Sequence, residues 1–599
     1  MFWLSSDPDV YRTTSRYNHP FWFGPWAKGI RFDPSQDTGT KAAANFQWKD
    51  ANQVVCHAMA VGEWGGVQFR VAHASSAGGG KTDLIFSHGG YQQARGAAFR
   101  HGSSRYYLEG DRQVCYAPHL SFPLPHSLAC SLTPCFCLLQ FLDAPGEWHY
   151  DQATRELFII PPQEFTAPTA AKLNAAEVLL TQTDTLFEFV GSSSDSGSRV
   201  ENIVFANLSF SHTSSQFFRP HEETSGGDYS THRSGAVKVE NATGLAFTGS
   251  NFSWIGGNGV VLSASVRGVN VSSSVFRFLG TSGVVVQGKT GDAMMDGRDG
   301  EQMAAVHGPA ADNGVRYPTG NLVVGNVFAD YGIWDKQSAC FHKALAPDNV
   351  FKNNVCFNAS RHGVNFQDGV GGSIAEGNVM FNLNRETSDT TAFNSWSRRH
   401  YITSHADDPA VATLIPSRYN QWRRNLVLGR NFWGVRDGNG DGLRNDDGSS
   451  FYTHSNNVLY KVGITFNGGT QIHAIGNLFV AGGGWQMGPT PDVASAFNNT
   501  FVETTNVLSG SCTGFFQKPT HRGQGNTPGI YTGDFNVRIA GTTNQSVGPM
   551  AFCGINLSAW QADTRGQDMH SHAINASDFG YTPRKIVAHA KSMLYAGCV

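Results

Sequence analysis

The chain has few charged residues for its length. Asp, Glu, Lys and Arg make up 15% of its 599 residues, and the net charge is −3. A protein that binds nucleic acid or an anionic membrane through charge carries a basic surface, so we expect neither partner. Disordered chains combine high charge with few apolar residues, whereas 40% of this chain is hydrophobic. We therefore expect a folded protein.

Long apolar runs are also missing. No stretch approaches the roughly 20 apolar residues that a membrane-spanning helix requires. The first seven residues, Met1-Phe-Trp-Leu-Ser-Ser-Asp7, lack the basic segment and apolar core of a secretory signal peptide. We therefore expect no membrane association and no signal peptide within this chain.

The ten cysteines do not have the spacing of a metal site. Four lie between Cys115 and Cys137, the other six are scattered, and no two close pairs occur as in a zinc site. We interpret them as buried or incidental thiols, with a disulfide framework as the alternative.

Glycine, in contrast, is abundant at 68 residues, and a short pattern that often includes it recurs. The pattern is a small or polar residue, then asparagine, then apolar residues, at steps of about 20–28 residues with one step about twice as long. It occurs at Asn326, Asn354, Asn378, Asn431, Asn457, Asn477 and Asn499. A repeat of this length is one turn of a solenoid, and apolar residues that alternate with polar ones have strand period. We predict an all-β fold, a right-handed parallel β-helix of about ten coils whose equivalent asparagines stack at one corner.

Differences in residue pattern along the sequence predict that the chain has three structural parts. Residues 1–185 are expected to form an irregular β-rich N-terminal domain with an insertion at about 113–140, because strand-like runs there are broken by Gly and Pro. Residues 186–510 are expected to form the β-helix, and 511–599 a C-terminal cap and tail. Insertions at about 214–233, 288–318 and 397–424 interrupt the repeat, and such loops commonly build the binding surface of a solenoid.

Acidic residues gather in three consecutive repeats. They are Asp368 in the first repeat, Asp389 in the second, and Asp446 and Asp447 in the third. Because neighbouring coils are about one strand spacing (~5 Å) apart, these side chains can converge on one patch. Glycoside hydrolysis uses two carboxylates within roughly 5–10 Å, one as acid and one as base or nucleophile. Asp also closes turns in a Gly-rich solenoid, which is the alternative for each residue taken singly.

Polar and aromatic residues near these carboxylates are candidates for binding substrate. Arginine can hold an acidic sugar through paired hydrogen bonds, and an indole ring can stack on an apolar sugar face. The same residues could instead balance the Asp charges or pack beneath loops, and a single histidine is often structural. The candidates are His342, Arg361, His362, Asn365, Gln367, Arg385, Glu386 and Trp396.

One segment matches the first half of a calcium-binding loop. Asp437, Asn439 and Asp441 alternate with glycines, but the twelfth position is Gly448 instead of the bidentate Glu that such a loop needs. An Asx-rich turn is the alternative. We expect no metal in the catalytic site and no other cofactor, so calcium at this segment is the single cofactor to consider.

Several segments resemble the right-handed β-helix enzymes of the pectin-lyase-like superfamily. Arg361-His-Gly-Val-Asn-Phe-Gln-Asp-Gly369, Glu386-Thr-Ser-Asp-Thr390 and Asn445-Asp-Asp-Gly-Ser449 carry the likeness, which is nearest to glycoside hydrolase families 141 and 120 and covers most of the chain. The resemblance implies a pair of acidic residues on the groove face, which fall here on Asp389 and on Asp446 or Asp447. Relatives carry an acidic residue where this chain has Arg444.

These observations predict a glycoside hydrolase that acts on a plant- or algal-type polysaccharide containing fucose or xylose, by a two-carboxylate mechanism. Two alternatives stay open: a polysaccharide lyase or uronate epimerase on the same fold, and a non-catalytic glycan-binding β-helix. We expect a polysaccharide or oligosaccharide partner, a monomeric chain, and secretion to the cell exterior.

Overall fold

The computed structural model divides into two compact units, Met1–Leu180 and Thr181–Val599. It describes residues 4–5, 11–12, 27–32, 51–59, 63–79, 81–92, 105–109, 148–151, 154–161, 175, 179–192, 198–223, 230–288, 317–367, 371–388, 390–396, 419–429, 442–446, 449–467, 469, 471–487, 493–502, 506–510, 530–534, 536–540, 551–552, 555–563, 569–575 and 582–595.

The first unit is built on a seven-stranded antiparallel sheet. Its core contains Val67, Phe69 and Leu84. In spatial order the strands are β1 (Leu4–Ser5), β7 (Arg105–Glu109), β4 (Val55–Met59), β5 (Gly66–Gly78), β6 (Lys81–Gly89), β3 (Ala27–Phe32) and β2 (Tyr11–Arg12). A 3₁₀ turn η2 (Ala51–Gln53) precedes β4, and β8 (Trp148–Asp151) forms a hairpin with β9 (Glu156–Ile159). This is the β-rich N-terminal part that the sequence predicts, and the insertion expected at 113–140 lies outside the described residues.

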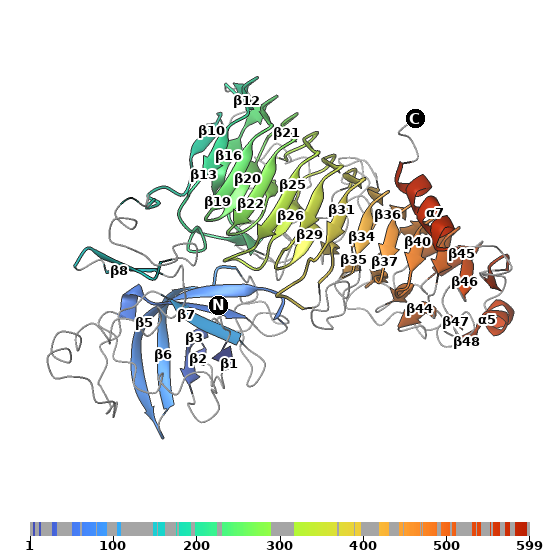
Figure 1. Ribbon diagram of the computed structural model, residues 1–599, viewed down its shortest axis with the longest axis horizontal. Coiled ribbons are helices and arrows are strands. Elements are labelled where there is room, and N and C mark those ends of the chain that lie inside the picture. Colours follow the sequence, from blue (N-terminus) through green and yellow to red (C-terminus); the bar gives the residue numbers. More distant parts are fainter. Residues whose placement is uncertain are drawn as a thin grey trace, which may run out of the picture. The chain divides into compact units, whose positions relative to one another are not determined.

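The second unit is a right-handed parallel β-helix, as predicted. Each coil adds one strand to each of three sheets, and the coils succeed one another in chain order (Figure 1). The 13-stranded sheet consists of β10 (Phe187–Val190), β16 (Gly235–Glu240), β20 (Asn258–Ser263), β23 (Val284–Gln287), β26 (Ala339–Ala344), β29 (His362–Phe366), β32 (Phe393–Trp396), β35 (Leu443–Asp446), β38 (Ile464–Phe466), β41 (Trp485–Met487), β44 (Asn506–Gly510), β47 (Ala551–Phe552) and β48 (Ile555–Asn556).

The other two long sheets run beside it in the same order. The 11-stranded sheet consists of β12 (Val204–Ala206), β18 (Ala246–Thr248), β21 (Asn270–Ser272), β24 (Leu322–Val324), β27 (Val350–Lys352), β30 (Ile374–Glu376), β33 (Asn420–Arg423), β36 (Tyr452–Ser455), β39 (Ile472–Ile475), β42 (Val493–Phe497) and β45 (Ile530–Asp534). The 12-stranded sheet consists of β13 (Ser209–Ser211), β19 (Asn251–Ile255), β22 (Val275–Leu279), β25 (Val327–Tyr331), β28 (Val355–Phe357), β31 (Val379–Phe381), β34 (Leu426–Leu428), β37 (Val458–Tyr460), β40 (Leu478–Val480), β43 (Thr500–Val502), β46 (Val537–Ala540) and β49 (His572–Asn575). Two short pairs, β11 (Val200–Glu201) with β17 (Ala242–Thr243) and β14 (Glu222–Glu223) with β15 (Ser230–Thr231), complete the strands of this unit.

The core runs along the inside of the coils. Register between strands puts equivalent residues directly over one another, so that Phe210, Phe252, Phe276 and Phe328 form a stack with ring centroids 4.5–4.6 Å apart. Because successive strand residues point to opposite faces, the residues between these core positions lie on the outside of the coil. This alternation decides which side chains are available for a site.

An asparagine ladder runs along one corner of the coils, as predicted. In each step the backbone N–H and the Nδ2 of one asparagine donate to Oδ1 of the next, at 2.9–3.2 Å. The ladder consists of Asn326, Asn354, Asn378, Asn425, Asn457, Asn477, Asn499 and Asn536, all buried. Ser274 precedes it and Ser571 follows it, each accepting a backbone N–H through Oγ. The ladder satisfies corner groups that would otherwise be buried without partners.

One predicted member of the ladder is wrong. The ladder position in that coil is held by Asn425, while Asn431 lies outside the described residues. The residue before a ladder asparagine adopts a left-handed backbone, which glycine or asparagine accepts at little cost, as at Gly377 with φ 68°. At Asn425 the preceding residue is Arg424, with φ 55°. Arg430 precedes Asn431 in the same way, and apolar residues follow both asparagines, so the sequence pattern did not distinguish Asn425 from Asn431.

Two further expectations differ from the structure. The stacked sheets continue past residue 510 as far as β49, because a wider step of 37 residues still brings Asn499 onto Asn536. The expectation of unpaired thiols is wrong for Cys340 and Cys356, which form a disulfide. The two belong to β26 and β28 of one coil, and both lie in its core. Cys56 is a buried free thiol.

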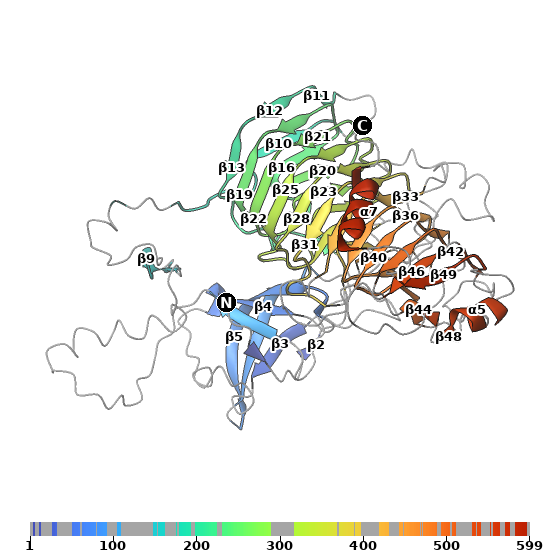
Figure 2. The same cartoon turned by 45° about the vertical axis from the view of Figure 1, so that its right-hand side comes forward.

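Two helices follow the last coils. The short α5 (Leu557–Asp563) follows β48, and α7 (Pro583–Tyr595) lies against the outer face of the 12-stranded sheet (Figure 2). Met593 of α7 packs with Val458, Leu478 and Val502 of that sheet. No helix in the described residues has the length and apolar character needed to cross a membrane.

Replacing one ladder residue tests what the ladder contributes. Asn378→Leu removes the acceptor of the Asn354 N–H and of one Asn354 Nδ2 hydrogen, although Nδ2 still donates to the Val323 carbonyl, and it removes the side-chain donor to the carbonyl of Phe351. We expect the free energy of unfolding in denaturant to fall by about 3 kcal/mol. Asn378→Ser is the matched control, because its Oγ can accept the N–H as Ser274 does, and it should cost clearly less. Equal losses in the two variants would contradict a hydrogen-bonding role.

Candidate active site

A row of polar residues crosses the outer face of the 13-stranded sheet. Register aligns His342 of β26 with Asn365, Asn394, Arg444 and Thr465 of the four strands that follow. Their neighbours along each strand, such as Val364 and Ile464, belong to the core, so this row faces outward. Asn394 Nδ2 donates to Asn365 Oδ1 at 2.9 Å, and Asn365 Nδ2 lies 3.1 Å from His342 Nδ1.

A second outward row lies two residues further along the strands. Trp396 of β32 is aligned with Asp446 of β35. Trp396 is 4% exposed, whereas the Asp446 side chain is 16% exposed. Gln367, at the end of β29, is 2% exposed, and its Oε1 accepts no hydrogen bond from the described residues. The two rows together place a carboxylate open to solvent beside buried hydrogen-bonding groups.

Two neighbours fix the carboxylate of Asp446. Asn467 Nδ2 donates to Oδ1 at 2.5 Å, and Arg444 Nε lies 3.4 Å from Oδ2. An adjacent guanidinium favours the charged form of a carboxyl group. Arg444 therefore acts as an ion-pair partner of Asp446.

The histidines of this face are neutral. Burial, with the charges of Lys343 and Arg361, lowers the pKa of His342 to about 3. Burial and the charge of Arg361 also hold the pKa of His362 well below its usual range, although a hydrogen bond from Nδ1 to the Thr391 carbonyl opposes the shift. Because Asn365 Nδ2 is a donor, His342 accepts through Nδ1 and carries its proton on Nε2. His342 is thus a neutral hydrogen-bond donor at any ordinary pH.

The remaining described candidates are engaged elsewhere or exposed. Glu386 forms an ion pair of 2.9 Å with the buried Lys336, whose ammonium also donates to the carbonyls of Gly332 and Ile333. Arg385 is exposed, and its backbone N–H donates to the Ala359 carbonyl. These two residues belong to the turn that leads into β32. Seven described candidates do fall on or beside the outer face: His342, Arg361, His362, Asn365, Gln367, Trp396 and Asp446.

Three of the four predicted catalytic carboxylates cannot be positioned. Asp368, Asp389 and Asp447 lie outside the described residues, and so do the calcium-loop residues Asp437, Asn439 and Asp441. Within the described ranges, no three His, Cys, Asp or Glu side chains are grouped so that they could hold a metal ion. Asp446 is therefore the predicted carboxylate whose surroundings are known.

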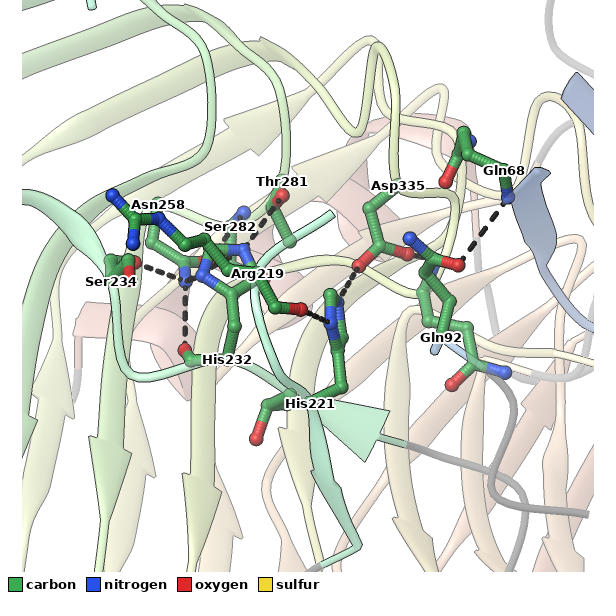
Figure 3. A network of polar contacts seen from close by, with 12 residues as sticks. Gln68, Gln92, Arg219, His221, His232, Ser234, Asn258, Thr281, Ser282 and Asp335 are labelled. Carbon is green, nitrogen blue, oxygen red and sulfur yellow. Dashed lines mark hydrogen bonds and ion pairs between the residues drawn. The ribbon is translucent and has the colours of Figure 1, made fainter. Parts of the chain in front are cut away.

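A second polar network lies at the edge of the same sheet where its strands begin. Figure 3 shows His221 between the Asp335 carboxylate and the backbone carbonyl of Arg219. Nδ1 of His221 is 2.7 Å from that carbonyl, and Nε2 is 3.4 Å from Asp335 Oδ2. The ring of His232 packs edge-on against His221 at 4.9 Å, and Asn258 Nδ2 donates to the His232 carbonyl.

His221 contacts both Arg219 and Asp335. Because a carbonyl only accepts, Nδ1 of His221 donates to the Arg219 carbonyl, and Nε2 faces the Asp335 carboxyl group at 3.4 Å. Burial raises the pKa of Asp335, while His221, the Gln337 N–H and Arg361 oppose that shift. Both side chains are almost fully buried. The first insertion of the sequence thus brings a buried histidine beside a buried carboxyl group, and Arg361 is close enough to lower the pKa of that carboxyl group.

Sequence reasoning missed this network. His221 and His232 lie at the two ends of the described part of the 214–233 insertion, and Asp335 is 114 residues from His221. Two histidines within one insertion of a solenoid were the available signal, because insertions commonly return to the binding face.

Comparison with known proteins gives a likeness in structure only. No protein-family model matches the chain, and no curated protein matches it. A solved structure described as a glycoside hydrolase superposes with a TM-score of 0.52 at 15% identity, over 83% of this chain and 74% of the other. The likeness establishes the fold.

Two further solved structures match with lower scores. The periplasmic alginate epimerase AlgG gives a TM-score of 0.29 at 10% identity, over 57% of this chain and 74% of the epimerase. The catalytic domain of a GH87 alpha-1,3-glucanase variant in complex with tetrasaccharides gives 0.25 at 10% identity, over 91% of this chain and 96% of that one. These structural neighbours are carbohydrate-active proteins. At such low sequence identities, their substrates and mechanisms are not evidence for those of this chain.

Proposed function

We propose that this protein is a glycoside hydrolase whose active site is the outer face of the 13-stranded sheet around Asp446. The observation that carries the proposal is a partly open carboxylate, paired with Arg444 and Asn467, in register with Trp396. Neutral hydrogen-bonding groups lie beside it, including His342 and the Asn365 amide. Amides and neutral imidazoles complement sugar hydroxyls, and an indole complements the apolar face of a sugar ring.

The proposed mechanism uses two carboxylates. Asp446, charged beside Arg444, would act as base or nucleophile, and a second carboxyl group would protonate the leaving oxygen. We propose Asp389 as that acid; Asp447 is the alternative to Asp446, and Asp368 is the reserve candidate. As first substrates we propose plant- or algal-type polysaccharides with fucose or xylose, following the resemblance to families 141 and 120, and we propose that the protein acts outside the cell as a monomer.

One observation favours a second function, a lyase or epimerase. Those reactions remove a proton next to a sugar carboxylate whose charge is neutralised. Arg361 is close enough to His342 of the outer face to lower the pKa of that histidine. An arginine so placed could pair with a uronate.

A polysaccharide panel separates these functions. For a hydrolase we expect new reducing ends without the ultraviolet absorbance of an unsaturated uronate. A lyase would produce that absorbance, and an epimerase would change the sugar composition without cutting the chain. If the folded protein changes no polysaccharide but retains one in affinity electrophoresis, both catalytic proposals fail and a glycan-binding β-helix stands in their place.

A further inference from the structure

Two buried polar atoms on the outer face have no hydrogen-bond partner within the described part of the chain. They are Thr465 Oγ1 of β38 and Gln367 Oε1 beyond β29. Thr465 is 4% exposed and Gln367 is 2% exposed. Thr465 lies between the core residues Ile464 and Phe466, and it is aligned with Arg444, so it belongs to the outward row. Its sequence neighbours gave no reason to single it out.

An unpaired buried hydroxyl lowers the stability of the fold. Such groups are uncommon in native proteins, and functional sites are among the places that retain them. In the same row, Asn394 Nδ2 donates to Asn365 Oδ1, and Asn365 Nδ2 donates to His342 Nδ1. Valine has nearly the same shape as threonine and would avoid the unpaired hydroxyl, so packing alone does not account for the hydroxyl at this position.

The positions of the two atoms suit a ligand that passes Asp446. Strands β32 and β35 lie between β29 and β38, so the two residues are about three strand spacings (~15 Å) apart, with Asp446 on an intervening strand. A threonine hydroxyl can donate to or accept from a sugar hydroxyl, and a glutamine Oε1 accepts from one. A ligand that reaches both must span several strands, which a single sugar cannot do.

We propose that Thr465 is a substrate-binding residue, which with Gln367 holds an oligosaccharide of about three sugar units across β29–β38. The inference rests on the proposed function only in taking a glycan as the ligand. Thr465 binds a sugar hydroxyl at one end of the site, Gln367 binds one at the other, and the bond to be cut lies near Asp446. The class of ligand is an oligosaccharide or polysaccharide rather than a simple glycoside.

The test compares Thr465→Val and Gln367→Met with Thr453→Val, a matched change on β36 of the 11-stranded sheet. The probes are xylotriose and a fucose trisaccharide, titrated calorimetrically against the intact chain, with xylose and fucose as single-sugar counterparts. We expect the first two variants to weaken binding of one trisaccharide about tenfold and Thr453→Val to leave it unchanged. We also expect Thr465→Val to keep or raise the unfolding temperature.

Three outcomes would contradict the inference. A lower unfolding temperature for Thr465→Val would mean that the hydroxyl is structural. Unchanged trisaccharide affinity in Thr465→Val, or no binding of either trisaccharide by the unchanged chain, would mean that this face does not hold such a ligand. Binding that depends on Thr465 in a chain that hydrolyses nothing would uphold this inference while removing the proposed hydrolase.

Discussion

Asp446→Asn is expected to lower the turnover of the polysaccharide substrate by about 10²–10⁴-fold, because an amide can neither accept the proton nor attack the sugar. The amide is nearly the same shape, and its oxygen can still accept from Asn467 Nδ2. The thermal unfolding temperature should therefore change little. Initial rates of reducing-end release, measured beside an unfolding curve for the same preparation, check both expectations.

Asp447→Asn is the matched control for that substitution. Adjacent strand residues point to opposite faces, and Asp446 occupies the outward position at the end of β35. The two variants should therefore differ widely in rate. If Asp446→Asn retains full activity and Asp447→Asn does not, the carboxylate has been assigned to the wrong residue. Asp389→Asn, made in the same series, tests the proposed acid.

Acid is expected to destabilise this protein well before its carboxylates titrate. Burial lowers the pKa of His342 and of His454 to about 3 from a usual value of 6.5. The unfolded chain therefore binds protons that the folded chain does not, so stability is complete above pH 6.5 and falls as the pH drops from 6.5 toward 3. Between pH 6.5 and pH 5 each of the two histidines should cost about 2 kcal/mol of unfolding free energy.

His454→Gln tests this through the slope of stability against pH. His454 Nε2 lies 2.5 Å from Asn445 Oδ1, and Trp422 and Phe466 surround the ring, so a proton on Nδ1 would enter an apolar space. Glutamine keeps a donor toward Asn445 but cannot be charged. Denaturant unfolding at pH 7 and pH 5 should show a smaller difference in this variant than in the unchanged chain. His572→Gln, at an exposed histidine, should not reduce the difference, and an unchanged slope in His454→Gln would contradict the account.

The fold could be predicted from the sequence because each coil repeats the same local requirement. At each turn of the ladder, a residue with left-handed backbone conformation precedes a buried asparagine. The pairs Gly-Asn and Asn-Asn meet both requirements, as at Asn378 and Asn354. The requirement concerns the backbone conformation, and Arg424 also meets it before Asn425. Because Arg430 precedes Asn431 in the same way, the sequence pattern did not distinguish these two asparagines, and the prediction took the wrong one.

The candidate site could be predicted from the sequence only in part. Strand alternation and register were enough to expect Asp446 on the outer face level with Asn467, because both follow from counting residues along neighbouring coils. The His221–Asp335 pair was not, since its members meet only when an insertion folds back over 114 residues of chain. The unpaired hydroxyl of Thr465 could not be predicted either, because the sequence does not show which hydrogen-bond partners surround a buried side chain.

The most direct test of the proposed site is a crystal structure of the Asp446→Asn variant with an oligosaccharide from the polysaccharide that the panel identifies. We expect the sugar on the outer face of the 13-stranded sheet, crossing β29, β32, β35 and β38 and contacting Gln367, Trp396 and Thr465. A sugar bound on another sheet, with this face empty, would contradict the account.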